Sequence, residues 1–399
     1  MIVNQQLRQS TSRMTFFWAL IALILFFFSE DMRKTIVGEY ALMVDDMKIK
    51  YIVLLFSFVA IYVSSHVDII LHNKFSPEAK YFWYAFFSVL FTTLFFQLNV
   101  GFHSESINEF LYLLVPFLFV SCVVSADESV AERLVESCFF LTLLCYFLTV
   151  LHGVISGLSI YSISFVDSFS PFENELSPYF VYFEIYYLFK GNKKRSFLCV
   201  VLTFLSLKRF CLLKAILFYI LFAFTDLRKI DKRLFWLTII AFILLPVAME
   251  YLVRADDWRF LEELTGQDAE TFTMSRSSIF LYTMQEIDKL NFGFGTTVYL
   301  LQDWAAQSLH SDILRLYLEG TLFVTIVYTM SFFHMVRNYN LYTFLIFFQV
   351  FSEGIFNHWM LGAGITCQWI IIYLMIFTIN RSDKLKDSRL VSKLNYKSL

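Results

Sequence analysis

Residues 234–250 read LFWLTIIAFILLPVAME, an apolar run in which Glu250 is the first charged residue. A helix of that length and composition spans most of a hydrocarbon layer about 30 Å thick. Residues 254–319 follow closely and form the only long polar stretch away from the two ends of the chain. Similar apolar runs recur on both sides of that stretch. The sequence therefore predicts an all-α polytopic membrane protein with a single membrane domain, residues 1–399.

The amino-acid composition is also that of a membrane protein. Apolar residues make up 58% of the chain and charged residues 17%, with a mean hydropathy of +0.62. A soluble domain has about half apolar and about a quarter charged residues. The alternating pattern of a membrane β-barrel is absent. The net charge is −2 and no basic tract is present, so no nucleic-acid partner is expected.

About twelve apolar runs are candidate transmembrane helices, and the Lys and Arg residues between them indicate the orientation. The runs lie at about residues 14–29, 51–72, 81–100, 108–125, 137–157, 176–190, 196–206, 210–225, 234–250, 309–330, 341–352 and 362–379. Lys and Arg gather in alternate connections, whereas the connections 100–107, 158–175 and 353–361 contain none. This pattern predicts cytoplasmic termini, a cytoplasmic tail over residues 380–399, and a large, partly helical outer loop over residues 251–308.

Five basic residues are expected at the outer end of the helices: Lys208, Arg209, Arg254, Arg259 and Arg276. An arginine guanidinium binds two phosphate oxygens at once and keeps its charge, so a phosphate or pyrophosphate is the expected ligand. The alternative is that the loop arginines form ordinary surface ion pairs. Carboxylates near them in the sequence stand at Asp256, Asp257, Glu262 and Glu263.

Charged residues inside apolar runs are expected to find partners, because a lone charge at membrane depth is unfavourable. Lys214 stands in the eighth run and Glu184 in the sixth, so a mutual ion pair is one expectation. Asp312, Arg315 and Glu319 follow one another at spacings of three and four in the tenth run. That spacing places them on one helix face, where they can neutralise one another.

His310 stands where the polar stretch enters the tenth run. At the first turn of a helix the dipole disfavours imidazolium, so a neutral ring able to accept a proton is expected. The alternative is a histidine that only forms hydrogen bonds at headgroup level. Earlier in the same stretch, residues 291–295 read NFGFG, and the two glycines predict a turn whose backbone approaches another segment closely.

No metal or cofactor site is predicted. The six cysteines all lie in or beside apolar runs, where they are expected to be small buried side chains. Neither the cysteines nor any pair of histidines has the spacing of metal ligands.

The order of these features resembles the O-antigen polymerase (Wzy) and O-antigen ligase (WaaL) superfamily of bacterial inner-membrane glycosyltransferases. The similarity consists of a basic turn, an arginine-led helix, a Gly-x-Gly turn and a histidine pair leading into a span. It rests on Ser206, Lys208, Arg209, Ser275, Arg276, Gly293, Gly295, His310, Ser311, Leu314, Glu319 and Gly320. The small residue expected one turn after Gly320 is Phe323 here, and the spacing after His310 departs from the ligases. Polymerases are therefore favoured.

The resemblance implies glycosyl transfer at the periplasmic face of the inner membrane, with residues 251–308 as the periplasmic loop between the ninth and tenth helices. Donor and acceptor would both be undecaprenyl-pyrophosphate-linked glycans. Arg276 and Arg209, with Arg254 or Arg259, would hold the pyrophosphate, and His310 would take the proton of the attacking hydroxyl. No metal or cofactor would be needed, and a chain-length regulator of the Wzz type is a possible partner beside the membrane lipid.

Three alternatives remain open at this point. One is an O-antigen ligase, which would use the same kind of donor. Another is a glycosyltransferase that uses a carboxylate of the first outer loop, Asp45 or Asp46, as base or metal ligand. The last is a flippase or transporter of lipid-linked oligosaccharides, a class that favours paired half-repeats with matching helix breaks.

Overall fold

A computed structural model describes residues 12–25, 27, 79–126, 128–159, 170–174, 176–255, 262–263, 266, 276–302, 309–357, 360–361 and 366–397. Within these ranges the regular elements are all helices, apart from an isolated β-bridge between Lys229 and Asn340. The predicted all-α class is therefore confirmed for this part of the chain. The second predicted span and the residues Asp45, Asp46 and Arg259 lie outside it.

The helices follow the apolar runs of the sequence. A helix at Ser12–Leu25 precedes α3 (Ala79–Val100), α4 (Glu105–Ala126), α5 (Glu128–Ile155), α6 (Ser177–Phe189), α7 (Lys193–Leu205), α8 (Arg209–Phe222), α9 (Lys232–Ala255), α12 (Arg276–Ile287), α13 (Thr296–Leu300), α14 (Asp312–His334), η1 (Arg337–Tyr339), α15 (Leu341–Phe356) and α16 (Thr366–Lys397). Five of them are long and apolar enough to cross a membrane: α3, α4, α5, α9 and α14. The residues of the predicted cytoplasmic tail, up to Lys397, continue α16 as a helix.

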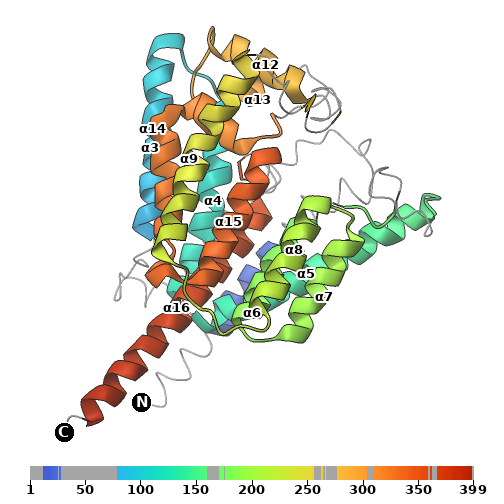
Figure 1. Ribbon diagram of the computed structural model, residues 1–399, viewed down its shortest axis with the longest axis vertical. Helices are drawn as coiled ribbons and strands as arrows, with labels where there is room; N and C mark the ends of the chain where they lie inside the picture. Colours follow the sequence, from blue (N-terminus) through green and yellow to red (C-terminus); the bar gives the residue numbers. More distant parts are fainter. Residues whose placement is uncertain are drawn as a thin grey trace.

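Helix α14 packs against α3, α9 and α15, and Figure 1 shows it beside α3 at one side of the molecule. Helix α16 packs against α4 and α5, while α6 contacts α7, α8 and α15. Figure 1 shows α12 and α13 together at one end of the molecule. We call that end, which also carries the start of α14, the loop end. The opposite end, which carries the start of α9 and η1, is called the basic end.

Aromatic side chains fill the spaces between these helices. Phe82 of α3 stacks on Phe117 of α4 with ring centroids 3.7 Å apart, and Phe332 of α14 lies 5.2 Å from Trp369 of α16. Because lipid tails are as apolar as these rings, burial in a membrane gives little driving force by itself. Close packing and aromatic contact geometry therefore hold the helices together.

Helix α14 is broken in the middle. Thr321 has φ +70° and ψ 173°, a backbone region that is almost restricted to glycine, and Gly320 precedes it. Just before the break, the carbonyl of Leu318 accepts a hydrogen bond of 3.0 Å from the side-chain amide of Asn291. An interruption at membrane depth is tolerated when other groups satisfy the freed backbone. The NFGFG turn thus supplies a partner to the broken helix.

Candidate functional site

The predicted basic turn at Lys208 and Arg209 lies toward the loop end. Helices α8 and α15 are antiparallel, because Lys214 pairs with Glu353 while Phe218 contacts Phe348 at 6.5 Å. Glu353 is close to the end of α15, so the start of α8 lies beside the end of α15. The N-terminus of α8 therefore places Arg209 at the loop end of the bundle.

His310 is joined to the same region through Asp312. The backbone nitrogen of Asp312 donates to the carbonyl of Asn357, just after α15, at 3.3 Å. The Asp312 carboxylate accepts hydrogen bonds from the backbone nitrogens of Met360 and Leu361, at 2.5 and 3.0 Å. The start of α14 is thus fixed to the connection between α15 and α16. This places His310, two residues earlier, on the same side as the start of α8.

The conformation of His310 differs from the prediction of a first helical turn. Its φ is +51°, in the left-handed region, and α14 begins only at Asp312. Ser311 is the N-cap, and its hydroxyl accepts a hydrogen bond from the backbone nitrogen of Leu314 at 3.4 Å. The half-buried imidazole therefore lies just outside the helix, beside its positive end.

Arg254 is engaged by carboxylates other than those suggested by the sequence. Its guanidinium donates two hydrogen bonds to Asp288, at 2.7 and 3.0 Å, and one to Glu250 at 2.7 Å. The pairing lowers the pKa of Asp288. Tyr317 of α14 donates to the same Glu250 at 2.6 Å. Arg254 therefore ties α9 to the end of α12, which favours the surface ion-pair interpretation for this residue.

Arg276 begins α12, and Asp288 directly follows that helix. With a rise of about 1.5 Å per residue, the two positions are roughly 18 Å apart. Arg254 and Arg276 thus lie at opposite ends of α12. Partial burial lowers the pKa of Arg276. The positive end of the helix dipole does not stabilise a guanidinium. An anion bound at this position would interact favourably with the helix dipole and with the Arg276 guanidinium.

Lys208 also has a protein partner. Its ammonium lies 3.2 Å from the carboxylate of Glu173, in the segment that precedes α6. The pair joins the basic turn before α8 to residues 170–174. Of the predicted ligand-binding residues, Lys208 and Arg254 therefore form ion pairs within the protein.

The Gly-x-Gly turn packs against α3 and α4, as predicted for a close backbone approach. Gly293 has φ +88°, and a Cβ there would lie 2.6 Å from the Cα of Thr93. The backbone nitrogen of Phe294 donates to the Thr93 hydroxyl at 3.0 Å, and the Phe294 carbonyl accepts from Ser106 at 2.6 Å. His103, in the turn between α3 and α4, stacks on Phe292 at 3.9 Å. The glycines are explained by helix packing.

The backbone donors after this turn are occupied by Glu319. Its carboxylate accepts hydrogen bonds from the backbone nitrogens of Gly295 and Thr297, at 3.2 and 2.8 Å, and from the Thr297 hydroxyl at 2.6 Å. A carboxylate of the protein thus fills the position where a phosphate would meet these amides. The turn therefore has a structural role.

Glu319 belongs to a buried ionic chain. Arg315 donates to Glu319 at 3.2 Å and to Glu109 of α4 at 2.8 Å, and all three side chains are at most 6% exposed. The expected neutralisation within α14 is confirmed for Arg315 and Glu319. The Asp312 carboxylate accepts its hydrogen bonds from the backbone nitrogens of Met360 and Leu361. Glu109 was not predicted as a member of this chain, although a carboxylate at the start of the fourth run needs a partner.

Lys214 does not pair with Glu184, so that prediction is wrong. Lys214 forms a buried ion pair with Glu353 and donates to Ser352 at 3.1 Å. Both carboxylate oxygens of the fully buried Glu184 lack a hydrogen-bond partner among the described residues. Helix α15 continues past the predicted end of its apolar run and brings Glu353 into the core. In the sequence, the position of Glu353 directly after that apolar run could have indicated it as a partner for Lys214.

Glu353 gathers further donors. Cys211 donates to it at 3.2 Å, Gln349 at 3.3 Å and Asn357 at 3.1 Å. Asn357 also accepts from the backbone of Asp312. A continuous set of contacts therefore leads from α8, through Glu353 and Asn357, to the start of α14. These contacts fix the helix ends that carry Arg209 and His310 relative to each other.

Comparisons with protein-family models, with curated proteins and with solved structures find no match for this chain. The resemblance described above therefore rests on the quoted residues alone.

Proposed function

We propose that this protein is an inner-membrane glycosyltransferase that polymerises undecaprenyl-pyrophosphate-linked repeat units into a surface polysaccharide, such as O-antigen. The observation that carries the proposal is the common location of three predicted residues. Arg209 starts α8, Arg276 starts α12 and His310 precedes α14, and all three lie toward the loop end. A lipid-borne diphosphate held there would meet fixed positive charge and a proton acceptor together.

The distribution of basic residues supports a periplasmic loop end. The basic end carries Lys80, Lys190, Lys193, Lys194, Arg195, Arg228, Lys229, Lys232, Arg233 and Arg337. Contacts place several of these segments together: Ile230 donates to Tyr339, and Phe189 lies 5.7 Å from Tyr342. By the positive-inside rule this end faces the cytoplasm. The twelve-span topology with cytoplasmic termini fits this orientation and is part of the proposal.

The proposed chemistry is a displacement at the anomeric carbon of the donor sugar. The acceptor hydroxyl oxygen forms the new bond to that carbon, while His310 takes the hydroxyl proton. The bond between the carbon and the pyrophosphate oxygen breaks, and the electron pair leaves with the undecaprenyl pyrophosphate. Arg276 and Arg209 stabilise the charge that grows on this leaving group. Lys208 and Arg254 support the site through their ion pairs with Glu173 and Asp288.

The buried ionic groups support the positioning that such a site needs. Glu319 and Arg315 fix the turn before α13 to α14, and Glu353 fixes α8 and α15 to each other. Groups that are held in place before the reaction stabilise developing charge without reorganisation. A chain-length regulator of the Wzz type is the protein partner that the resemblance implies.

A second candidate function is transport of lipid-linked oligosaccharides. The break in α14 at Thr321 favours it, because discontinuous membrane helices form substrate sites in many transporters. A ligase would share the donor and the proposed residues, and would differ in its acceptor.

Complementation of a polymerase-deficient strain tests the proposal and separates these functions. Wild type and Lys194→Ala, an exposed change at the basic end, are expected to restore a ladder of polysaccharide chain lengths. His310→Ala and Arg276→Ala are expected to leave single repeat units. Ladders from both of these variants would contradict the proposed residues. Failure of wild type, together with rescue of a ligase- or flippase-deficient strain, would assign the alternative function.

A further inference from the structure

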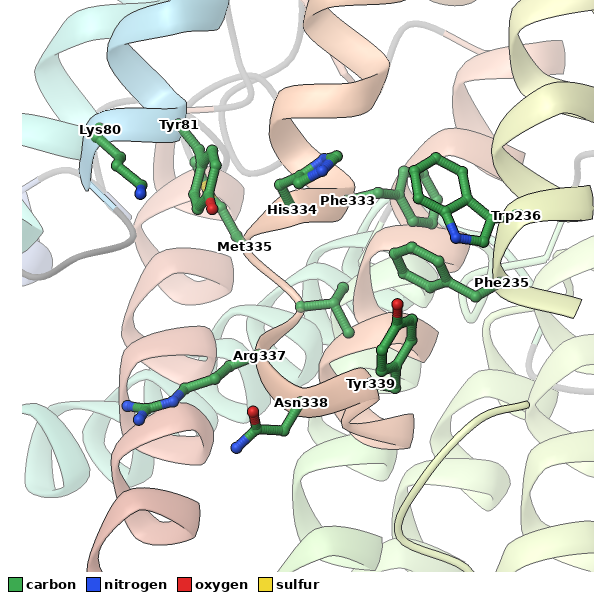
Figure 2. Close-up of a pocket in the computed structure, with 11 residues that line it drawn as sticks. Lys80, Tyr81, Phe235, Trp236, Phe333, His334, Met335, Arg337, Asn338 and Tyr339 are labelled. Atoms are coloured by element: carbon green, nitrogen blue, oxygen red, sulfur yellow. The ribbon is translucent and has the colours of Figure 1, made fainter. Parts of the chain in front are cut away.

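A pocket of about 390 Å³ lies at the basic end, at the other end of α14 from His310. It is formed by the starts of α3 and α9 and by the turn that leads from α14 through η1 to α15 (Figure 2). Its volume falls within the range of about 300–1,000 Å³ that is typical of small-molecule sites. None of the proposed catalytic residues lines the pocket. Its ligand therefore binds apart from the proposed pyrophosphate site.

The charge of the pocket is one-sided. Lys80 and Arg337 contribute to the lining, and none of the described lining residues is a carboxylate. In the part of the chain that the structure describes, no ion pair joins Lys80 or Arg337 to an acid. Cationic groups that have no counter-ion among these residues favour an anionic ligand, and the guanidinium of Arg337 suits the geometry of phosphate oxygens.

The remaining wall is aromatic. His334 lies between Tyr81, at 5.5 Å, and Trp236, at 6.1 Å between ring centroids. Figure 2 shows Lys80 and Arg337 on one side of the pocket and Trp236 and Tyr339 on the other. A pocket with a cationic side and an aromatic side matches a ligand that joins a phosphate to an apolar body. Free phosphate would contact only the cationic side of the pocket.

The turn that carries Arg337 is held in shape by its neighbours. Asn338 and Tyr339 both have left-handed backbones, with φ of +51° and +54°. The Tyr339 carbonyl accepts from the backbone of Ile230 at 2.9 Å, and Asn380 of α16 donates to the Met335 carbonyl at 2.9 Å. Strained backbone that is fixed from both sides is typical of ligand clamps.

The position along the helices identifies the class of ligand. Lys80 begins a candidate span, and Trp236 lies one turn into another. Trp, Tyr, Lys and Arg at such helix ends lie at headgroup depth, and basic pockets between membrane helices bind anionic headgroups. We propose that this pocket binds the phosphate of an anionic phospholipid headgroup, through Lys80 and Arg337, with the glycerol and first acyl carbons against Trp236 and Tyr339.

Native mass spectrometry of the full chain, released from detergent micelles containing phosphatidylglycerol or phosphatidylcholine, tests the proposal. Wild type is expected to retain phosphatidylglycerol in preference to phosphatidylcholine. Each basic contact at an anionic surface is worth about 1 kcal/mol, or roughly fivefold, so Lys80→Gln/Arg337→Gln should weaken retention by roughly 25-fold. The matched control is Lys193→Gln/Lys194→Gln, which removes the same charge from exposed residues at the same end and should retain the lipid.

Two kinds of result would overturn the assignment. One is equal retention of phosphatidylglycerol by wild type and the pocket variant, or equal retention of both lipids by wild type. The other is displacement of the lipid by millimolar inorganic phosphate, which would assign the pocket to a soluble phosphate. Lys80→Gln alone, an exposed change at a helix start, keeps the test valid if the double variant does not fold, and a fivefold loss is expected for it.

Discussion

The carboxylate of Glu319, in α14, lies 2.8 Å from the backbone nitrogen of Thr297, at the start of α13. The same carboxylate accepts from Arg315, which in turn contacts Glu109 of α4. Three helices and the Gly-x-Gly turn therefore share one buried charge network. In the complete network each buried charge has an ion-pair or hydrogen-bond partner. Removing one side chain leaves the remaining charges buried without that partner.

Substitution of Glu319 by Ala is therefore expected to lower the free energy of unfolding by about 3–5 kcal/mol, the range for breaking a buried ion pair. The measurement is denaturant unfolding of the purified protein in detergent. Glu286→Ala is a suitable control, because Glu286 pairs with Lys289 at the surface, and such pairs are worth about 0–1 kcal/mol. Equal losses for the two variants would show that the network does not hold the loop end together.

The ion pair of Lys214 and Glu353 gives a second prediction. Lys214→Met alone and Glu353→Met alone each leave one buried charge without its partner and should strongly destabilise the protein. The double variant removes both charges and should be more stable than either single variant. A double-mutant cycle on unfolding free energies measures this coupling. Losses that simply add would contradict the pairing.

The close approach at Gly293 gives a third prediction. Gly293→Ala places a Cβ 2.6 Å from the backbone of Thr93 at a φ of +88°, so the turn must move and the melting temperature should fall. Gly101→Ala is matched to it, because Gly101 has a φ of +98° but no atom within 4 Å of the added Cβ. The Gly101→Ala variant therefore loses stability only through the unfavourable backbone conformation of alanine, without a steric clash. A Gly293→Ala protein as stable as Gly101→Ala would argue against the packing role.

The contact of Asp288 with Arg254 predicts a small dependence of stability on acidity. The folded-state pKa of Asp288 is below its ordinary value of 3.8. This contribution is therefore fully present above that ordinary value and is lost as the pH falls through the lower folded-state pKa. Melting temperatures measured between pH 6 and pH 3 should fall less steeply for Asp288→Asn than for wild type. Parallel curves would show that the contact adds no stability in solution.

Local patterns predicted much of the fold and the nearest contacts of the candidate site. Within the described residues, the apolar runs fold as helices, the glycines of the NFGFG turn approach α3, and Arg315 pairs with Glu319 one turn away. These features depend on residues that are neighbours along one helix or within one turn. The all-helical class of the described residues could therefore be predicted from the sequence.

Contacts between distant segments could not be predicted in the same way. The sequence offers Lys214 two carboxylates inside or beside apolar runs, Glu184 and Glu353. The contact of α8 with α15 pairs Lys214 with Glu353. Arg254 likewise binds Asp288, which the fold of α12 brings to the end of α9. The break at Thr321 has no sequence signal of its own, because threonine rarely adopts such a backbone. The two ion-pair partners and the position of the helix break therefore depend on tertiary packing.

We propose that the loop end transfers glycosyl groups, with His310 as the proton acceptor and Arg276 binding the pyrophosphate. The most direct measurement is chain elongation by purified protein in liposomes that contain a synthetic lipid-pyrophosphate-linked repeat unit. We predict elongation by wild type, and losses of about 10²–10⁴-fold in rate for His310→Ala, the range for removal of a general base. Arg276→Ala should also lose most of its rate, while Lys194→Ala should match wild type. Elongation by His310→Ala and Arg276→Ala at the wild-type rate would contradict the roles proposed for these two residues.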